Sequence, residues 1–169
     1  MKISGKTIFK RLKPLTVIEN RLSRIRHFHG HGVHSPFVYY FVRKVLMTKH
    51  LIDGNPDLYT TLENIRISKK RSRQLSNAMI YCGCKTYSID SFEGDFVILS
   101  SKTDEDQLQN CYDICHAKGK VLIIMEPYRT RKRNGICRAL ILSHSSTSID
   151  NRAFVLFMNN DLPKQHYIL

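Results

Sequence analysis

The stretch DFVILSSKTDEDQLQNCYDICHAKGKVLIIMEP, residues 95–127, decides the fold class of this chain. Its two ends, DFVILSS (95–101) and KVLIIMEP (120–127), are continuous apolar runs that predict buried strands. Between them, Thr103 with Asp106 three residues later is typical of a helix start. Buried strands on either side of a helix indicate a parallel β-α-β unit. We therefore expect an α/β fold.

Weaker strand signals flank this unit. KTYSID (85–90) precedes it as a short strand candidate, and a basic segment, YRTRKRNGICRALIL, follows it. Beyond that segment, three more strands are predicted, at residues 146–150, 153–158 and 165–169. The last two strands, joined by NNDLPK, are expected to form an antiparallel hairpin.

The first part of the chain has the pattern of helices. Apolar residues at steps of three and four predict a basic amphipathic helix over residues 14–28. Ser35-Pro36 is typical of a helix start and predicts a short apolar helix over residues 36–47. Residues 57–79 predict one or two further helices, which carry the basic run KKRSR.

Charge divides the chain in the same way. The formal net charge is +13 over 169 residues. Residues 1–75 contain 16 Lys+Arg and 4 Asp+Glu, a net charge of +12, whereas residues 76–169 contain 11 and 10, a net charge of +1. We expect two regions, a basic helical one over 1–75 and a truncated α/β domain over 76–169. The basic region predicts attraction to an anionic partner, either nucleic acid or a membrane surface.

The cysteines and the apolar runs bear on cellular location. Five cysteines are an odd number in a chain with no export signal, which predicts reduced thiols that pack as small apolar residues. They are Cys82, Cys84, Cys111, Cys115 and Cys137. No run of 18 apolar residues is present to span a membrane, and residues 8–25 lack the apolar core of a signal peptide. A cytoplasmic location is expected.

Four histidines fall within eight residues: His27, His29, His31 and His34. Because His29-Gly30-His31-Gly32 is expected to have a flexible backbone, and no carboxylate occurs over residues 20–52 to orient the rings, no metal site is predicted. The chain contains no P-loop, G-x-S-x-G, H-E-x-x-H or paired C-x-x-C motif. No catalytic residue is assigned, and a Cys–His pair that meets only in the folded chain is left open.

Both ends of the chain resemble one family. HGVHSPFVYYFVRKVL (31–46) is similar to the leader of a bacterial family of class I S-adenosylmethionine-dependent methyltransferases, in which a basic helix, this segment and an apolar helix precede a Rossmann-like domain. TSIDNRAFVLFMNNDLPKQHYIL (147–169) resembles that family's last strands and closing Lys-x-His-aromatic-x-Leu. Residues 95–101 and 120–127 fall where its fourth and fifth strands would lie. The resemblance implies a Rossmann-like sheet, S-adenosylmethionine as cofactor and methyl transfer.

The middle of the chain departs from that family. A glycine-rich turn and an acidic residue would hold the cofactor at the ends of the first two strands, by the physics of dinucleotide-binding folds. Here Gly83 and Asp90 are the only remnants of those positions. Asp90 is either the ribose-binding acid after a second strand or what is left of the acidic end of the first. MEPYRT (125–130), with the single acid Glu126, replaces the acidic segment expected after the fifth strand.

Length points the same way. Asp95 follows Leu75 by 20 positions, whereas each parallel crossover needs roughly a dozen residues. We therefore expect a reduced Rossmann-like sheet in a degenerate methyltransferase homologue that lacks an intact S-adenosylmethionine site and acts without catalysis. One alternative is an active methyltransferase completed by a partner chain or a homodimer.

The other alternative is a basic module that binds nucleic acid or an anionic surface. Aromatic side chains next to basic ones favour it: Tyr39, Tyr40, Phe41, Arg43 and Lys44. Because a shortened sheet leaves an open strand edge, we also expect the N-terminal helices to cover part of the sheet, or the chain to form a homodimer.

Overall fold

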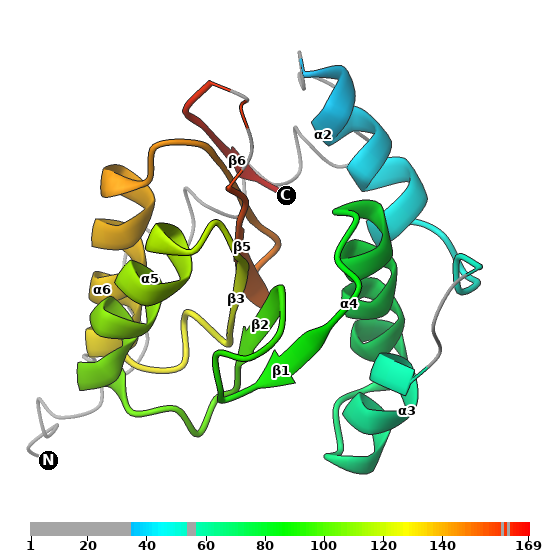
Figure 1. Ribbon diagram of the computed structural model, residues 1–169, viewed down its shortest axis with the longest axis horizontal. Helices are drawn as coiled ribbons and strands as arrows, with labels where there is room; N and C mark the ends of the chain where they lie inside the picture. The colour runs from blue at the N-terminus through cyan, green and yellow to red at the C-terminus, as the bar shows by residue number, and fades with distance from the viewer. Residues whose placement is uncertain (1–34, 54–56, 160, 162) are drawn as a thin grey trace, which may run out of the picture.

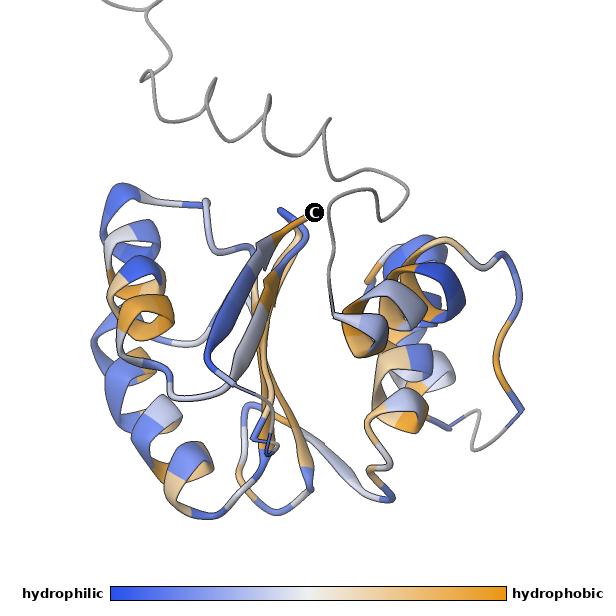
Figure 2. Cartoon of the chain, turned by 90° about the horizontal axis from the view of Figure 1, so that it is seen from above, coloured by the Kyte–Doolittle hydropathy of each residue, from blue (hydrophilic) through white to orange (hydrophobic). Residues whose placement is uncertain are grey.

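The computed structural model describes residues 35–53, 57–159, 161 and 163–169. They form three layers, with a six-stranded sheet between two layers of helices (Figures 1 and 2). The α/β fold expected from the sequence is confirmed. The predicted helix over residues 14–28 and the four clustered histidines lie outside the described residues.

The sheet has the strand order β1-β2-β3-β5-β4-β6. Its strands are β1 (Tyr87–Ile89), β2 (Phe96–Leu99), β3 (Val121–Met125), β4 (Thr147–Asp150), β5 (Phe154–Phe157) and β6 (Gln165–Ile168). β1, β2 and β3 are parallel, β6 is parallel to β4, and β5 runs antiparallel to both β3 and β4. All residues of β2 and β5 are buried, as expected for apolar strands covered on both faces.

The hairpin predicted between the last two strands is wrong. β5 forms its hairpin with β4, and β6 passes β5 to pair with β4 in parallel. The turn between β4 and β5 explains the pairing, because Asn151 Oδ1 accepts hydrogen bonds from the backbone N–H groups of Ala153 and Phe154, both at 3.1 Å. Arg152 takes a left-handed conformation, with φ of 72°. This tight turn holds β5 beside the strand that precedes it.

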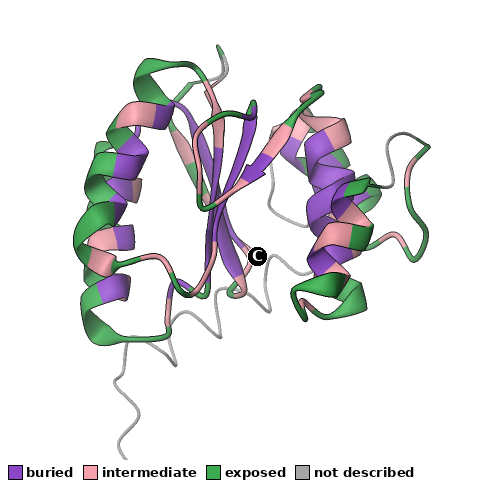
Figure 3. Cartoon of the chain, turned by 60° about the horizontal axis from the view of Figure 1, so that its bottom comes forward, coloured by how far each residue is buried: buried purple, intermediate pink, exposed green. Residues whose placement is uncertain are grey.

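Four described helical segments precede the sheet: α2 (Pro36–Phe41), the π-helical segment η2 (Val42–Leu46), α3 (Asp57–Asn64) and α4 (Lys69–Tyr81). The predicted start of α2 is confirmed, since the Ser35 side chain accepts a hydrogen bond from the Val38 N–H at 3.5 Å. Apolar side chains from all four segments share one core with a face of the sheet, and Figure 3 shows α4 buried over much of its length. The expected cover of the sheet by N-terminal helices is confirmed. α4 runs through residue 75, where the sequence placed the boundary between its two regions.

The other face of the sheet is covered by the 3₁₀ turn η3 (Glu105–Gln107), α5 (Leu108–Ala117) and α6 (Arg131–Ser143). The residue that caps the first turn is Asp104, whose Oδ1 accepts a hydrogen bond from the Asp106 N–H at 3.1 Å. The cap predicted at Thr103 is therefore one residue too early.

α6 was not predicted, because its buried stripe is short and lies in a segment rich in basic residues. It begins after Thr130, whose Oγ1 accepts a hydrogen bond from the Arg133 N–H at 3.0 Å. Its buried positions are Arg133, Cys137 and Leu140, at steps of four and three. One of these three buried residues is thus an arginine, within the segment that the sequence marked only as basic.

β1 and β2 are parallel neighbours although residues 90–95 alone connect them. Six residues are enough to connect the two strands, because β1 is only three residues long and the chain crosses directly over it at Gly94. A Cβ atom on Gly94 would lie 2.3 Å from the carbonyl carbon of Tyr87, so only glycine fits. Lys120 Nζ holds the connection by donating to the carbonyl oxygens of Phe92 at 2.6 Å and Gly94 at 2.8 Å. β1 is left at the edge of the sheet in the described part of the chain.

Candidate functional site

The carboxyl ends of the parallel strands β1, β2 and β3 lie side by side at one end of the sheet. Ligands of open parallel sheets bind beyond this end, which makes it the first place to look for a site. The loops that follow the three strands here carry Asp90, the segment 100–107 and the segment 126–130.

Asp90 lies at the end of β1 in a left-handed conformation, with φ of 54°. Its N–H donates to the carbonyl oxygen of Ile98 at 2.9 Å. Its Oδ1 accepts two hydrogen bonds, from the Ser100 N–H at 2.7 Å and from Thr103 Oγ1 at 2.6 Å. Bonds of this kind to a carboxylate are about twice as strong as neutral ones. The carboxylate therefore fastens the end of β1 to the loop after β2.

Gly83 lies near the opposite end of β1, where it terminates helix α4. It follows α4 with φ of 72°, and its N–H donates to the carbonyl oxygen of Ile80 at 3.0 Å. The Cys84 N–H reaches back to the carbonyl oxygen of Met79 at 3.1 Å, which completes the hydrogen-bond pattern of a glycine-terminated helix. Gly83 thus ends α4 before β1 begins, and the structure does not bring it together with Asp90.

The residues at this end of the sheet can be compared with those that the resemblance implies for S-adenosylmethionine. Recognition of a ribose needs a carboxylate that is available to its hydroxyl groups, and a glycine turn that lets the backbone approach the ligand. The exposed Asp90 side chain is bonded to the neighbouring loop through Oδ1, and the one glycine among residues 90–95 is Gly94, which the crossing over β1 requires.

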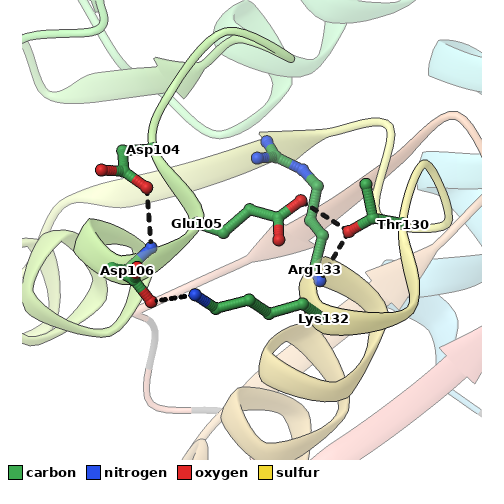
Figure 4. A network of polar contacts seen from close by, with 6 residues as sticks. All are labelled: Asp104, Glu105, Asp106, Thr130, Lys132 and Arg133. Atoms are coloured by element: carbon green, nitrogen blue, oxygen red, sulfur yellow. Dashed lines mark hydrogen bonds and ion pairs between the residues drawn. The ribbon is translucent and has the colours of Figure 1, made fainter.

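The Arg133 side chain binds at the ends of β2 and β3, and Figure 4 shows it beside the polar contacts of Thr130 and Lys132. The Arg133 side chain is 1% exposed. Nε and Nη2 donate to the carbonyl oxygen of Met125 at 3.1 and 3.0 Å, Nη2 also to that of Ser100 at 2.9 Å, and Nη1 to that of Thr103 at 3.2 Å. The guanidinium binds two carbonyl groups of the loop after β2 and one at the end of β3, and so joins the two.

The polar contacts of Thr130 and Lys132 lie in solvent. Thr130 Oγ1 donates to Glu105 Oε1 at 2.5 Å, and Lys132 forms an ion pair with Asp106. The hydrogen bond to Asp106 raises the pKa of Lys132. Exposed pairs of this kind add little stability. Most of the stability of these loops therefore comes from the buried Arg133.

The last residue of β4 is a buried acid. Asp150 is 2% exposed, and its two oxygens accept hydrogen bonds from the Tyr128 hydroxyl group and, at 2.7 Å, from the Arg152 N–H. Tyr128 belongs to the MEPYRT segment, so this segment contributes a phenol to a buried acid. Exposed Glu126 donates its N–H to the Ala153 carbonyl oxygen at 2.7 Å.

Sequence reasoning missed Arg133, Tyr128 and Asp150. The burial of Arg133 could have been predicted from its spacing, because the apolar residues of α6 follow it at steps of four and three. Asp150 could have been singled out because it ends a predicted strand. All three form contacts within the chain.

The cysteines are free thiols, as the sequence predicted. Cys111, Cys115 and Cys137 are buried between the sheet and the helices α5 and α6. Burial raises the pKa of Cys82 to about 12 and those of Cys115 and Cys137 to about 11. These three thiols are protonated near neutral pH and are poor nucleophiles.

A second candidate surface lies on α2 and η2, far along the chain from the sheet edge. Tyr39 and Tyr40 are 36% and 52% exposed, and Arg43 and Lys44 are exposed beside them. Phe41, which the sequence grouped with the two tyrosines, is fully buried in the core and cannot take part.

Within the described ranges, no group of His, Cys, Asp and Glu side chains is arranged to hold a metal ion. None of the described helices has the length and apolar character needed to cross a membrane. Comparison of the chain with protein-family models, with curated proteins and with solved structures finds no match.

Proposed function

We propose that the protein is a shortened relative of the class I methyltransferases that acts by binding another molecule and not by catalysis. The observation that carries this proposal is the state of Asp90. Its carboxylate accepts hydrogen bonds at 2.7 and 2.6 Å from the loop after β2, so it serves the fold where an enzyme of that class would serve the cofactor.

The sheet supports the kinship. Parallel β1, β2 and β3 are followed by a hairpin whose second strand, β5, inserts antiparallel between β3 and β4. The parallel part, β1 to β3, fits the reduced Rossmann-like sheet that the resemblance implies, whereas the insertion of β5 was not expected from it. The direct connection over residues 90–95 supports the loss of the cofactor pocket, because it leaves no strand beyond β1 in the described residues.

The helical layer supports a binding role. Residues 35–81 contain 8 Lys+Arg and 3 Asp+Glu, a net charge of +5. The same helices bury their apolar side chains against the sheet, which leaves basic side chains to face solvent. A fold of this kind presents a rigid basic surface to an anionic partner.

Isothermal titration calorimetry of the full chain with S-adenosylmethionine and S-adenosylhomocysteine tests the proposal. We expect no binding heat up to millimolar ligand, from protein whose cooperative thermal unfolding shows that it is folded. Micromolar binding that is lost in Asp90→Asn and kept in Glu93→Gln, an exposed acid of the same connection, would contradict the proposal and support the active enzyme.

A further inference from the structure

The exposed side of α2 and η2 has an unusual composition for a helix surface. The buried positions are Val38, Phe41, Val42 and Val45. The exposed positions Tyr39, Tyr40, Arg43, Lys44 and Met47 alternate with them, and we call these five residues the aromatic–basic face. The exposed side of an amphipathic helix is ordinarily charged and polar, so two exposed tyrosines beside two cations require another explanation.

Contacts within the face bring the rings and the cations together. The rings of Tyr39 and Tyr40 meet edge to face, with centroids 5.6 Å apart. Lys44 Nζ lies 5.7 Å from the centroid of the Tyr40 ring, within the range of a cation–π contact. No acidic residue occurs over residues 36–52, so nothing on this segment neutralises its cations.

The basic character continues onto α4. Gln74 Nε2 donates to the carbonyl oxygen of Leu46 at 2.9 Å, and Gln74 Oε1 accepts a hydrogen bond from Arg71 Nη1 at 2.6 Å. Arg71 is thereby fixed near the end of η2. It belongs to the KKRSR run, whose Lys69 and Lys70 are exposed at the start of α4.

The packing of the helix decides between two anionic partners. A helix that lies on a membrane buries its apolar side in the lipid. Here that side is already in the protein core, with Val38, Phe41 and Val45 at 0% exposure, so it cannot enter a bilayer. Exposed aromatic rings beside cations are instead what single-stranded nucleic acids require, because bases stack on the rings and phosphates pair with the cations.

We propose that the aromatic–basic face binds single-stranded nucleic acid, with bases stacked on Tyr39 and Tyr40 and phosphates paired with Arg43 and Lys44. This inference gives the proposed binding role a partner class. It rests on that role but not on the loss of the cofactor site, so calorimetry with S-adenosylmethionine and the experiment below can fail independently. Binding by stacking is tolerant of sequence and falls steeply with salt.

The test is fluorescence anisotropy of the full chain with labelled 12-nucleotide oligo(dT) and oligo(U) at two salt concentrations. The double variant Tyr39→Ala/Tyr40→Ala is expected to weaken binding by at least about tenfold, whereas Tyr39→Phe/Tyr40→Phe keeps it, because phenylalanine also stacks. Arg43→Gln/Lys44→Gln is expected to weaken binding and to reduce the salt slope by about 1.4, at about 0.7 per phosphate contact.

The matched control is Lys102→Gln/Lys118→Gln, which removes two exposed cations from other parts of the surface and is expected to leave the affinity within about twofold. All of these positions are exposed, and circular dichroism checks that each variant is folded. The proposal is overturned if the chain does not bind the oligonucleotides, if both face variants bind as tightly as the control, or if a 12-base-pair duplex binds as tightly as the single strand. It is also overturned if only phosphatidylserine vesicles bind.

Discussion

Gly94 and Gly135 show how the surroundings of a glycine decide what a methyl group does. At Gly94 the chain crosses β1 so closely that a Cβ atom would lie 2.3 to 2.7 Å from backbone atoms of Tyr87 and Ser88. At Gly135, within α6, a Cβ atom would meet nothing within 4 Å. The first glycine is required by the fold and the second is not.

We expect opposite effects from the two alanine substitutions. Gly94→Ala should lower the free energy of unfolding by about 3 kcal/mol, because the backbone beneath it cannot move without disturbing the sheet. Gly135→Ala should raise the free energy of unfolding by up to about 1 kcal/mol, since alanine is the better helix former. Urea unfolding of both variants checks this, and equal effects would mean that the connection over residues 90–95 takes another path.

His144 is a titratable side chain that the fold holds neutral. It is fully buried, and its Nε2 lies 2.8 Å from the Met158 carbonyl oxygen, which can only accept. Nε2 therefore carries the proton, and Nδ1 accepts a hydrogen bond from the Tyr112 hydroxyl group at 2.9 Å. Burial lowers the pKa of His144 below its usual 6.5.

A lowered pKa fixes the direction of the pH effect. The unfolded chain binds a proton at this position near pH 6.5 and the folded chain only at lower pH, so the contribution to stability is full above about pH 6.5 and is lost as the pH falls. We expect the free energy of unfolding to fall less between pH 7.5 and 5.5 in His144→Gln than in the parent chain. A parallel decrease in both proteins would show that His144 does not contribute.

At the scale of elements, one buried side chain joins two loops and a helix. Arg133 comes from the first turn of α6 and reaches the carbonyl oxygens at the ends of β2 and β3. Buried carbonyl groups that lose their donors retain the cost of their desolvation. The position of α6 against the sheet therefore depends on a polar residue in an otherwise apolar layer.

Arg133→Met keeps much of the side-chain volume and removes every donor. We expect it to lower the free energy of unfolding by about 3 kcal/mol, because the guanidinium hydrogen bonds to Met125, Thr103 and Ser100 are lost, and of these Ser100 keeps a bond from the Thr103 N–H. Arg138→Met, at an exposed position of the same helix, should change it by less than about 0.5 kcal/mol. Denaturant unfolding compares the two variants, and similar small effects would show that Arg133 is replaceable.

At the scale of the whole molecule, the local elements were more predictable than their arrangement. The apolar runs of β2 and β3 and the Ser35-Pro36 start of α2 are properties of short segments, so the sequence displays them. The insertion of β5 between β3 and β4 depends on contacts between distant segments. The same holds for Asp90, which the sequence offered as a cofactor remnant and whose partners, Ser100 and Thr103, are fixed only by the fold.

The two edge strands of the sheet, β1 and β6, also concern the whole molecule. Helices cover one face of the sheet. In the described residues no strand lies beyond β1, and β1 is only three residues long. Short edge strands resist pairing with another chain. We therefore expect a monomer of 19.7 kDa in size-exclusion chromatography with light scattering. A stable species of twice that mass would favour the homodimer.

In this account, the side chains at the carboxyl ends of β1, β2 and β3 stabilise the fold, and the basic helical layer binds the partner. Nitrogen-15 NMR shift mapping on one assigned sample, titrated with S-adenosylmethionine and separately with oligo(U), tests both halves at once. We predict that S-adenosylmethionine leaves the amide signals of Asp90, Ser100 and Thr103 in place, while oligo(U) moves those of residues 39–47. Saturable shifts at residues 90–103 with S-adenosylmethionine, and none at 39–47 with oligo(U), would contradict the claim.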